Sequence, residues 1–326
     1  MRLVYSFLCF IVISLSTAGI TEGVKQILVY DEKISKKNIS DTHNPYPRRF
    51  RTTSAPLKGE INVQGLKNLR ASASGQFTQD QLQRILTDVI TQQDIHKNEF
   101  ILIDLRQEPH LFANGKPFSL FSRYFTGNAG QTAEQVLSQE KNLKEQLQGQ
   151  DLITFYTVLK KGKDGQLGTT QQSFQSKPTL MTEEELAKQL GIRYVRLAVP
   201  DHQYPCASSV EAFIHLVQTL PSTSWLHFHC RGGSGRSSTF LLMYDIIKNG
   251  KNVPLADLMQ RQITLGGKDL DKENKKSAFL NKGAEDRQQF IHHFYKYVTA
   301  RDGLGHHTWS QWLKNHPLPL LPQKAN

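Results

Sequence analysis

The alternation of apolar and polar segments along the chain predicts an α/β fold. Three apolar runs, at 100–106, 194–199 and 225–228, have the length and composition of buried strands. Helical spacing of apolar side chains recurs in six segments between these runs and beyond them, at 79–92, 133–147, 183–190, 208–220, 254–263 and 286–298. Capping-box residues precede two of these helices, at Thr78 and Thr182, and Gly191 can end the second.

Residues 107–181 differ from the rest of the chain. They contain a β-rich run at 153–159, which the turn Lys163-Asp164-Gly165 follows. We therefore expect an inserted β-rich subdomain, with a small barrel as its form. The core domain should consist of 61–106 and 182–315, after an irregular polar arm at 19–60.

The N-terminus has the layout of a secretory signal peptide. Arg2 precedes an apolar stretch from Leu3 to Leu15, and small residues ending at Ala18 offer a cleavage site. The apolar stretch is too short for a transmembrane helix, so no stable membrane insertion is expected. Removal of 1–18 would leave an exported protein, either periplasmic or secreted.

The charge balance suggests an anionic partner. The formal net charge is +11 and the pI is about 9.5, which suits a phosphorylated substrate, a nucleic acid or a membrane surface. No run of five basic residues and no nucleic-acid-binding motif occurs, so nucleic acid is not expected. Beyond the signal peptide only Cys206 and Cys230 remain, too few for a disulfide framework. Either both thiols are free or they form a reversible bridge.

The stretch 229–237, His-Cys-Arg-Gly-Gly-Ser-Gly-Arg-Ser, carries the strongest chemical signal. It lies between an apolar strand and a predicted helix. The residues between Cys230 and Arg236 that can fold tightly and turn backbone N–H groups inward are Gly232, Gly233, Ser234 and Gly235. Such a loop can cradle a tetrahedral anion with a sulfur at its base.

The same positive field should act on the cysteine. A thiol at a helix N-terminus beside a guanidinium has a pKa below its usual value, so Cys230 is expected to be a nucleophilic thiolate. Arg236 can hold two phosphate oxygens with its planar fork. Ser237 can donate a hydrogen bond to the thiolate, and His229 can orient the loop from behind. A buried structural cysteine is the alternative, but it leaves Arg236 and Ser237 unexplained.

The spacing Cys-x5-Arg-Ser after a histidine resembles the signature of the protein tyrosine phosphatase superfamily. That superfamily places an aspartate general acid on a mobile loop upstream of its cysteine. Asp201 lies in a strand-to-helix loop that ends at Pro205, so we assign the acid to Asp201. Asp104 competes for this role, although its place at a strand end suits substrate positioning better.

Three blocks, at 103–110, 200–205 and 225–237, together resemble the bacterial PTP-like phytases. The resemblance implies a PTP-like core with an inserted barrel-like domain, and stepwise dephosphorylation of myo-inositol polyphosphates without a metal or cofactor. It also implies that Cys230 is the nucleophile and Asp201 the acid. A monomer is expected. The residues expected to contact substrate are Arg231, Gly232, Gly233, Ser234, Gly235, Asp104, His202, Arg51, Lys268, Lys272 and Lys275.

The sequence leaves several alternatives open for the substrate contacts and for the function. Among the lysines after the signature helix, the sequence does not decide which contact the substrate. Arg51 and its neighbours can instead be solvated surface charges. A phosphatase for phosphotyrosine or phosphoinositides would use the same chemistry in a different pocket. A phosphate-binding pseudoenzyme is the third alternative, against which the intact set of Cys230, Arg236, Ser237 and Asp201 argues.

Overall fold

The computed structural model of the protein describes residues 27–31, 45–163, 165–273 and 277–318. Two mixed sheets and the helices around them confirm the expected α/β class. The segment 1–18, which is predicted to be a signal peptide, and Lys275 lie outside the described residues. No helix in the described part of the chain combines the length and apolarity that crossing a membrane requires.

The core domain is built on a five-stranded sheet. Its strands, in spatial order, are β10 (Arg193–Val199), β4 (Phe100–Arg106), β11 (Trp225–His229), β3 (Ala71–Ser74) and β2 (Arg51–Thr52). The first four are parallel, and only the edge strand β2 is antiparallel. The carboxyl ends of β4 and β11 therefore meet at one edge, where α/β sheets place their ligand groups.

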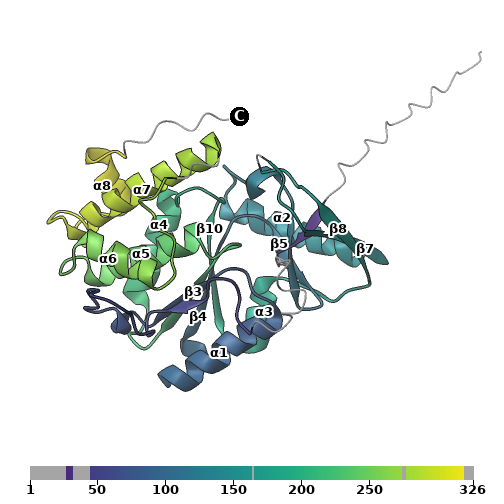
Figure 1. Ribbon diagram of the computed structural model, residues 1–326, viewed down its shortest axis with the longest axis horizontal. Coiled ribbons are helices and arrows are strands. Elements are labelled where there is room, and N and C mark those ends of the chain that lie inside the picture. The colour runs from purple at the N-terminus through teal and green to yellow at the C-terminus, as the bar shows by residue number, and fades with distance from the viewer. Residues whose placement is uncertain (1–26, 32–44, 164, 274–276, 319–326) are drawn as a thin grey trace, which may run out of the picture.

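Helices cover both faces of this sheet (Figure 1). On one face lie α1 (Gln79–Gln93) and α3 (Glu183–Leu190), which pack against Phe100 and Leu102 of β4. On the other face the side chains of Ile101 and Ile103 enter the main core. The helices of that face are α4 (Ala207–Thr219), α5 (Gly235–Asn249), α6 (Leu255–Thr264), α7 (Ala278–Thr299) and α8 (Trp309–Asn315). The alternation along β4 follows from the two-residue period of a strand.

The second sheet carries the insertion. Its order is β8 (Thr170–Ser176), β7 (Leu152–Val158), β1 (Leu28–Tyr30), β6 (Lys116–Leu120), β5 (His110–Ala113) and β9 (Leu180–Met181). Five of these strands and α2 (Ala133–Gln148) fall within the expected insert. Among the described strands no pairing joins β8 to β9, so a closed barrel is not confirmed.

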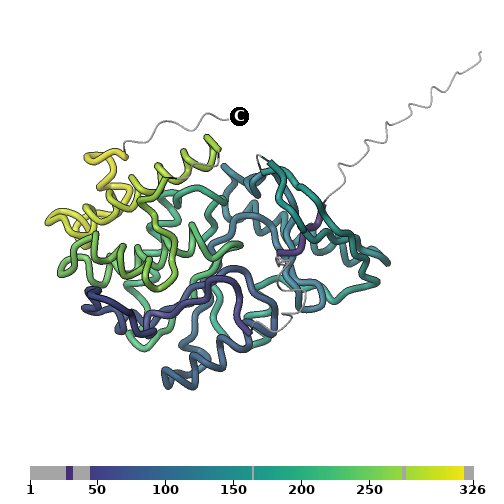
Figure 2. The backbone as a smooth tube through the Cα atoms, viewed as in Figure 1, coloured from purple at the N-terminus to yellow at the C-terminus, as the bar shows by residue number. Residues whose placement is uncertain are grey.

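The N-terminal arm departs from the expectation of irregular structure. Within 19–60, β1 joins the sheet of the insert, where it pairs with β6 and β7, and β2 joins the core sheet. In Figure 2 the purple strand lies inside the β-rich part, whereas the chain from residue 45 runs along the core domain. The arm therefore contributes to both sheets.

Candidate active site

The glycine-rich loop between β11 and α5 folds against the end of β3. Gly75 and Gly232 form an isolated antiparallel bridge, and Gln76 N donates to Arg231 O at 3.3 Å. Gly233 has φ +65°, and a Cβ there would lie 2.4 Å from Gly75 N. Any side chain at residue 233 would therefore force the loop away from β3.

Cys230 sits at the base of this loop with a side chain that is 2% exposed. Burial works to raise the pKa of the thiol, but the charge of Arg236 and hydrogen bonds from Ser237 outweigh it and lower the pKa below its usual value. The thiolate expected from the sequence therefore has a physical cause in the structure. The Ser237 hydroxyl oxygen also lies 3.1 Å from Ser74 O, which places the start of α5 against the end of β3.

Arg236 is fully buried and held by acceptors on one side. Its Nη1 and Nη2 donate to the two carboxylate oxygens of Glu108 at 2.6 and 2.8 Å. Nη1 also donates to Val199 O, and Nη2 lies 3.1 Å from Asp201 Oδ1. The Nε atom is buried without a hydrogen-bond partner in the described structure. Nε can therefore donate to an oxyanion directly, whereas at Nη2 an oxyanion would compete with Asp201.

Asp201 and His202 lie in the loop after β10, beside Arg236. Burial works to raise the pKa of Asp201, but Arg236 and His202 hold it well below the usual range. The two side chains of the loop approach each other at 3.5 Å, from His202 Nε2 to Asp201 Oδ2. His202 adopts φ 66°, a left-handed conformation that is uncommon for a residue with a side chain. The structure therefore brings the expected acid and the phosphate-binding arginine together.

His229 lies behind the loop, as expected, in a buried ion pair with Glu183. Burial works to raise the pKa of Glu183, but His229 overcomes it and lowers the pKa to about 2. Asp104 lies 3.6 Å from the same histidine nitrogen and is also fully buried, where it accepts a hydrogen bond from Tyr194. This position argues against the expected contact of Asp104 with substrate, because its partners fill its surroundings. We assign Asp104 a supporting role.

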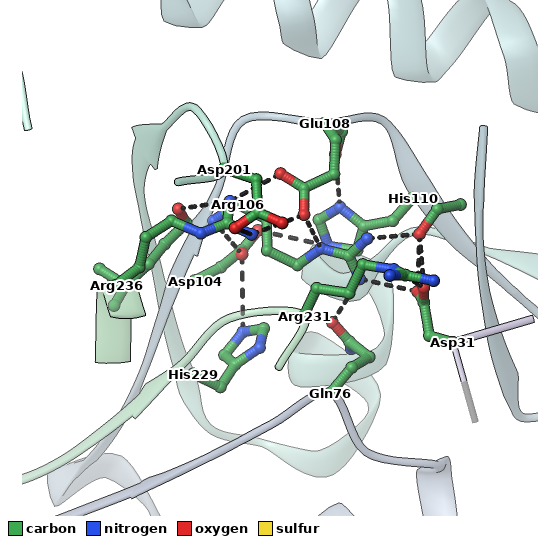
Figure 3. Close-up of polar contacts among 12 residues, drawn as sticks. Asp31, Gln76, Asp104, Arg106, Glu108, His110, Asp201, His229, Arg231 and Arg236 are labelled. Atoms are coloured by element: carbon green, nitrogen blue, oxygen red, sulfur yellow. Dashed lines mark hydrogen bonds and ion pairs between the residues drawn. The ribbon is translucent and has the colours of Figure 1, made fainter. Parts of the chain in front are cut away.

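A chain of alternating charges connects the two arginines of the loop (Figure 3). Arg231 Nε donates to Asp31 Oδ1 at 2.6 Å, and Arg106 Nη1 donates to Asp31 Oδ2 at 2.9 Å. Arg106 Nε in turn donates to Glu108, the partner of Arg236. Burial works to raise the pKa of Asp31, but both arginines overcome it and lower the pKa to about 2. The short strand β1 thus leads to a carboxylate beside the loop 230–236, which is expected to bind phosphate and is called the phosphate-binding loop below.

Aromatic side chains of the insert also reach the site. The 3₁₀ turn η3 (Arg123–Phe125) places the Phe125 ring 3.7 Å from the guanidinium carbon of Arg231. Tyr124 stacks on Phe279 of α7 at 4.5 Å and meets the His202 ring edge-on at 6.0 Å. The insert therefore contacts both the phosphate-binding loop and the loop of the acid.

One buried group within the described residues has the side chains for a metal ion, Asp104, His110 and Glu183, whose ligand atoms lie within 4.8 Å of one another. Burial and Arg106 work to lower the pKa of His110, but Asp104 and Glu140 outweigh them and raise it to about 10. In the arrangement described, His110 lies 3.4 Å from Asp104 and 3.3 Å from Glu183, so the three side chains form buried ion pairs.

The basic residues expected to contact substrate differ in position. Arg51 is 5% exposed and donates to Gly233 O and Ser238 Oγ, so it supports the loop from beneath and is not a solvated surface charge. Lys268 is partly buried, and its backbone N donates to Ser238 Oγ. Lys272 is exposed. Burial of Arg51 argues against direct contact with a substrate in this arrangement.

Both cysteines of the described part of the chain are free thiols. Cys206 is exposed at the start of α4, where its sulfur lies 3.2 Å from the hydroxyl oxygens of Ser208 and Ser209. Cys230 is buried. The structure thus corresponds to the free-thiol alternative.

Several charged residues of the site could not be predicted from the sequence, because their roles depend on distant partners. Glu108 belongs to the block 103–110 and Glu183 to a capping box, and neither pattern indicates the ion pairs that the two residues form with Arg236 and His229. Asp31 and Arg287 carried no local signal. Arg287 of α7 packs against Gly235 of the phosphate-binding loop.

Comparison with known proteins agrees with this geometry. The family model for PTP-like phytases, described as "Inositol hexakisphosphate", matches residues 103–248. A PTP-like myo-inositol phosphatase from Mitsuokella multacida, solved with myo-inositol-(1,3,4,5)-tetrakisphosphate, is 30% identical with a TM-score of 0.78, and the match covers 93% of this chain and 50% of that one. A PTP-like phytase from Bdellovibrio bacteriovorus is 28% identical with a TM-score of 0.66, covering 89% of this chain and 95% of that chain.

The effector protein hopD2 of Pseudomonas syringae pv. tomato is 27% identical over 214 residues, which are 65% of this chain and 45% of that protein. The chain spans about half the length of hopD2 and of the Mitsuokella protein. The family-model match, the shared fold and the signature loop support the assignment of the chain to the PTP-like phytases.

Proposed function

We propose that this protein hydrolyses myo-inositol hexakisphosphate and lower inositol polyphosphates through a phosphocysteine intermediate. One observation carries the proposal. Cys230 is buried and its thiol pKa is lowered by Arg236, whose Nε has no hydrogen-bond partner among the described atoms. A thiolate below a guanidinium edge is the arrangement that attack on a bound phosphate requires.

The reaction would proceed in two steps. The Cys230 sulfur attacks phosphorus, the bond from phosphorus to the inositol oxygen breaks, and Asp201 gives its proton to that oxygen. Water then attacks the phosphocysteine, the bond between sulfur and phosphorus breaks, and inorganic phosphate and the thiolate are released. Asp201 takes the proton of the attacking water. Arg236 and the backbone N–H groups of the loop would hold the charge that develops on the phosphoryl oxygens.

The family-model match and the complex of the Mitsuokella relative support inositol phosphates as the substrate class. The cluster of arginines around the loop is consistent with a substrate that carries several phosphates. Arg48 donates to Arg231 O and Arg51 to Gly233 O, so two of these arginines fix the loop itself. Arg231, whose side chain is 20% exposed, can meet a second phosphate.

The deciding experiment compares turnover of inositol hexakisphosphate and of a phosphotyrosine peptide by the full chain, with EDTA present. We expect faster turnover of the inositol phosphate, with activity retained in EDTA. The variant Cys230→Ser should lose turnover and still bind inositol hexakisphosphate in calorimetry. Faster turnover of the peptide would contradict the proposed substrate class. Substantial activity of Cys230→Ser would contradict the phosphocysteine mechanism.

We also propose that the protein is exported through the segment 1–18 and acts as a monomer in the periplasm or outside the cell. The motive is the layout of the N-terminus. N-terminal sequencing of the protein recovered from a cell fractionation would identify cleavage after Ala18. Recovery of intact Met1 in the cytoplasm would reject the proposal.

A further inference from the structure

Arg287 of α7 lies between the loop of the acid and the phosphate-binding loop. Its side chain is 4% exposed. Nη2 donates to Gln203 O at 3.3 Å, two residues after Asp201. On its other side the guanidinium packs against the phosphate-binding loop, because a Cβ built on Gly235 would lie 3.1 Å from the guanidinium carbon. One side chain thus contacts both loops.

The same helix fits closely against the loop of the acid one turn earlier. A Cβ at Gly283 would lie 2.3 Å from His202 O, so the backbone of α7 and the backbone of this loop are in direct contact. Gly283 and Arg287 are four residues apart and therefore face the same side of the helix. Together they form a surface of α7 against which His202 and Gln203 rest.

Arg287 is a buried cation that lacks a direct carboxylate partner among the described residues. Among the described residues no carboxylate lies within ion-pair distance of it, and its Nε has no hydrogen-bond partner. Burial lowers the pKa of Arg287 to about 10, although Asp201 and Cys230 act to raise it. Arg261 is also buried, but it forms a direct ion pair with Asp245. A buried cation without a direct counter-ion is costly, so its position beside two functional loops calls for a reason.

We propose that Arg287 is a positioning residue that holds the loop of Asp201 against the phosphate-binding loop, so that the acid can reach the leaving oxygen. The inference rests on the proposed function. Arg287 would act through Asp201 and not by contact with the substrate. Its loss should therefore resemble partial loss of the acid, and its effect should depend on how much the leaving group needs a proton.

The test uses aryl monophosphates, so that the charge of the substrate stays constant. Phenyl phosphate has a poor leaving group and dinitrophenyl phosphate a good one. We expect Arg287→Gln to lower kcat/KM for phenyl phosphate about tenfold or more, since general acid catalysis contributes about 10²–10⁴-fold. The loss for dinitrophenyl phosphate should be within about threefold, because that leaving group needs little protonation.

A double-mutant cycle with Asp201→Asn provides the second readout. If Arg287 acts through Asp201, adding Arg287→Gln to Asp201→Asn should lower kcat/KM for phenyl phosphate by less than about a further twofold. Arg287→Lys keeps the charge without the planar fork and should fall between Arg287→Gln and the wild type. Arg261→Gln is the matched control, because it removes a buried arginine away from both loops. Arg261→Gln should lower Tm without changing the ratio of the kcat/KM values for the two aryl phosphates.

Each outcome decides the matter. Equal losses for both leaving groups, or multiplicative losses in the double variant, would overturn the inference and leave the phosphatase proposal intact. If Arg287→Gln does not fold, the same two measurements on Arg287→Lys decide. A wild-type protein that hydrolyses neither the two aryl phosphates nor inositol hexakisphosphate would instead reject the proposed function on which the inference rests.

Discussion

The pH dependence of stability provides a sharp test of the buried ion pairs, with His110 as the perturbed residue. His110 Nε2 lies 3.4 Å from Asp104 and 3.3 Å from Glu183, and Nδ1 lies 3.5 Å from Glu140. Two arginines also face this side chain: Arg196, whose Nη2 lies 3.5 Å from Nδ1, and Arg106, whose charge works to lower the pKa of His110. Three carboxylates thus surround one imidazole, and their attraction exceeds the cost of its burial.

The magnitude follows from the pKa of His110, which rises from 6.5 to about 10. At 1.36 kcal/mol per pKa unit this shift corresponds to roughly 5 kcal/mol of stability. Because the pKa of His110 is raised in the folded protein, its contribution to the free energy of unfolding decreases as pH rises. The contribution is fully present below pH 6.5, where the folded and unfolded chains both hold the proton, and it is lost as pH rises toward 10. Between these values the free energy of unfolding should fall by up to about 1.4 kcal/mol per pH unit.

The assay is urea unfolding of the wild type and His110→Gln across this pH range. The difference in free energy of unfolding between the two proteins should be largest near pH 6 and should shrink steadily toward pH 10. Groups that titrate equally in both proteins cancel in this difference. His292→Gln is the control, because His292 pairs with Asp271 at the surface and its side chain is 48% exposed. A difference for His110→Gln that stays constant with pH would refute the reasoning.

Three further results are expected. Glu108→Gln removes the buried counter-ion of Arg236 and should lower the free energy of unfolding by about 3–5 kcal/mol in urea titrations; a change below about 1 kcal/mol would contradict the buried pair. Because the pKa of Asp201 is lowered, kcat/KM should fall as pH rises through the acidic range, and Asp201→Asn should flatten this limb of the profile. Asp31→Asn should release Arg231 and raise KM for inositol hexakisphosphate more than KM for an aryl monophosphate, and parallel changes would argue against that link.

The local parts of the fold could be predicted from the sequence because their causes are local. The capping boxes at Thr78 and Thr182 form within four residues, and both helices begin where expected. The phosphate-binding loop also follows from adjacent residues, since Gly233 needs a positive φ and α5 starts two residues later, at Gly235. Helix α8, by contrast, is not among the six predicted helical segments, although Thr308 forms a capping box there.

The non-local parts could not be predicted in the same way. Strand β1 has three residues and pairs with strands roughly 90 and 127 positions later, for example Leu28 with Leu120 and with Phe155. Nothing in its own sequence specifies those partners. The burial of Asp104 and Arg51 is likewise set by distant groups. The sequence therefore predicts that both contact the substrate, whereas the structure buries both side chains.

The ion pair between Asp201 and Arg236 bears on when the acid holds its proton. Nη2 of Arg236 lies 3.1 Å from Asp201, and the pairing keeps the pKa of the carboxyl well below its usual range. A phosphate group that binds Arg236 would compete for the same nitrogen and would bring negative charge close to Asp201. Like charges at close range raise the pKa of a carboxyl group. Substrate binding would therefore favour the protonated acid that the first step requires, and the buried pair with Glu108 would keep Arg236 in place during the exchange.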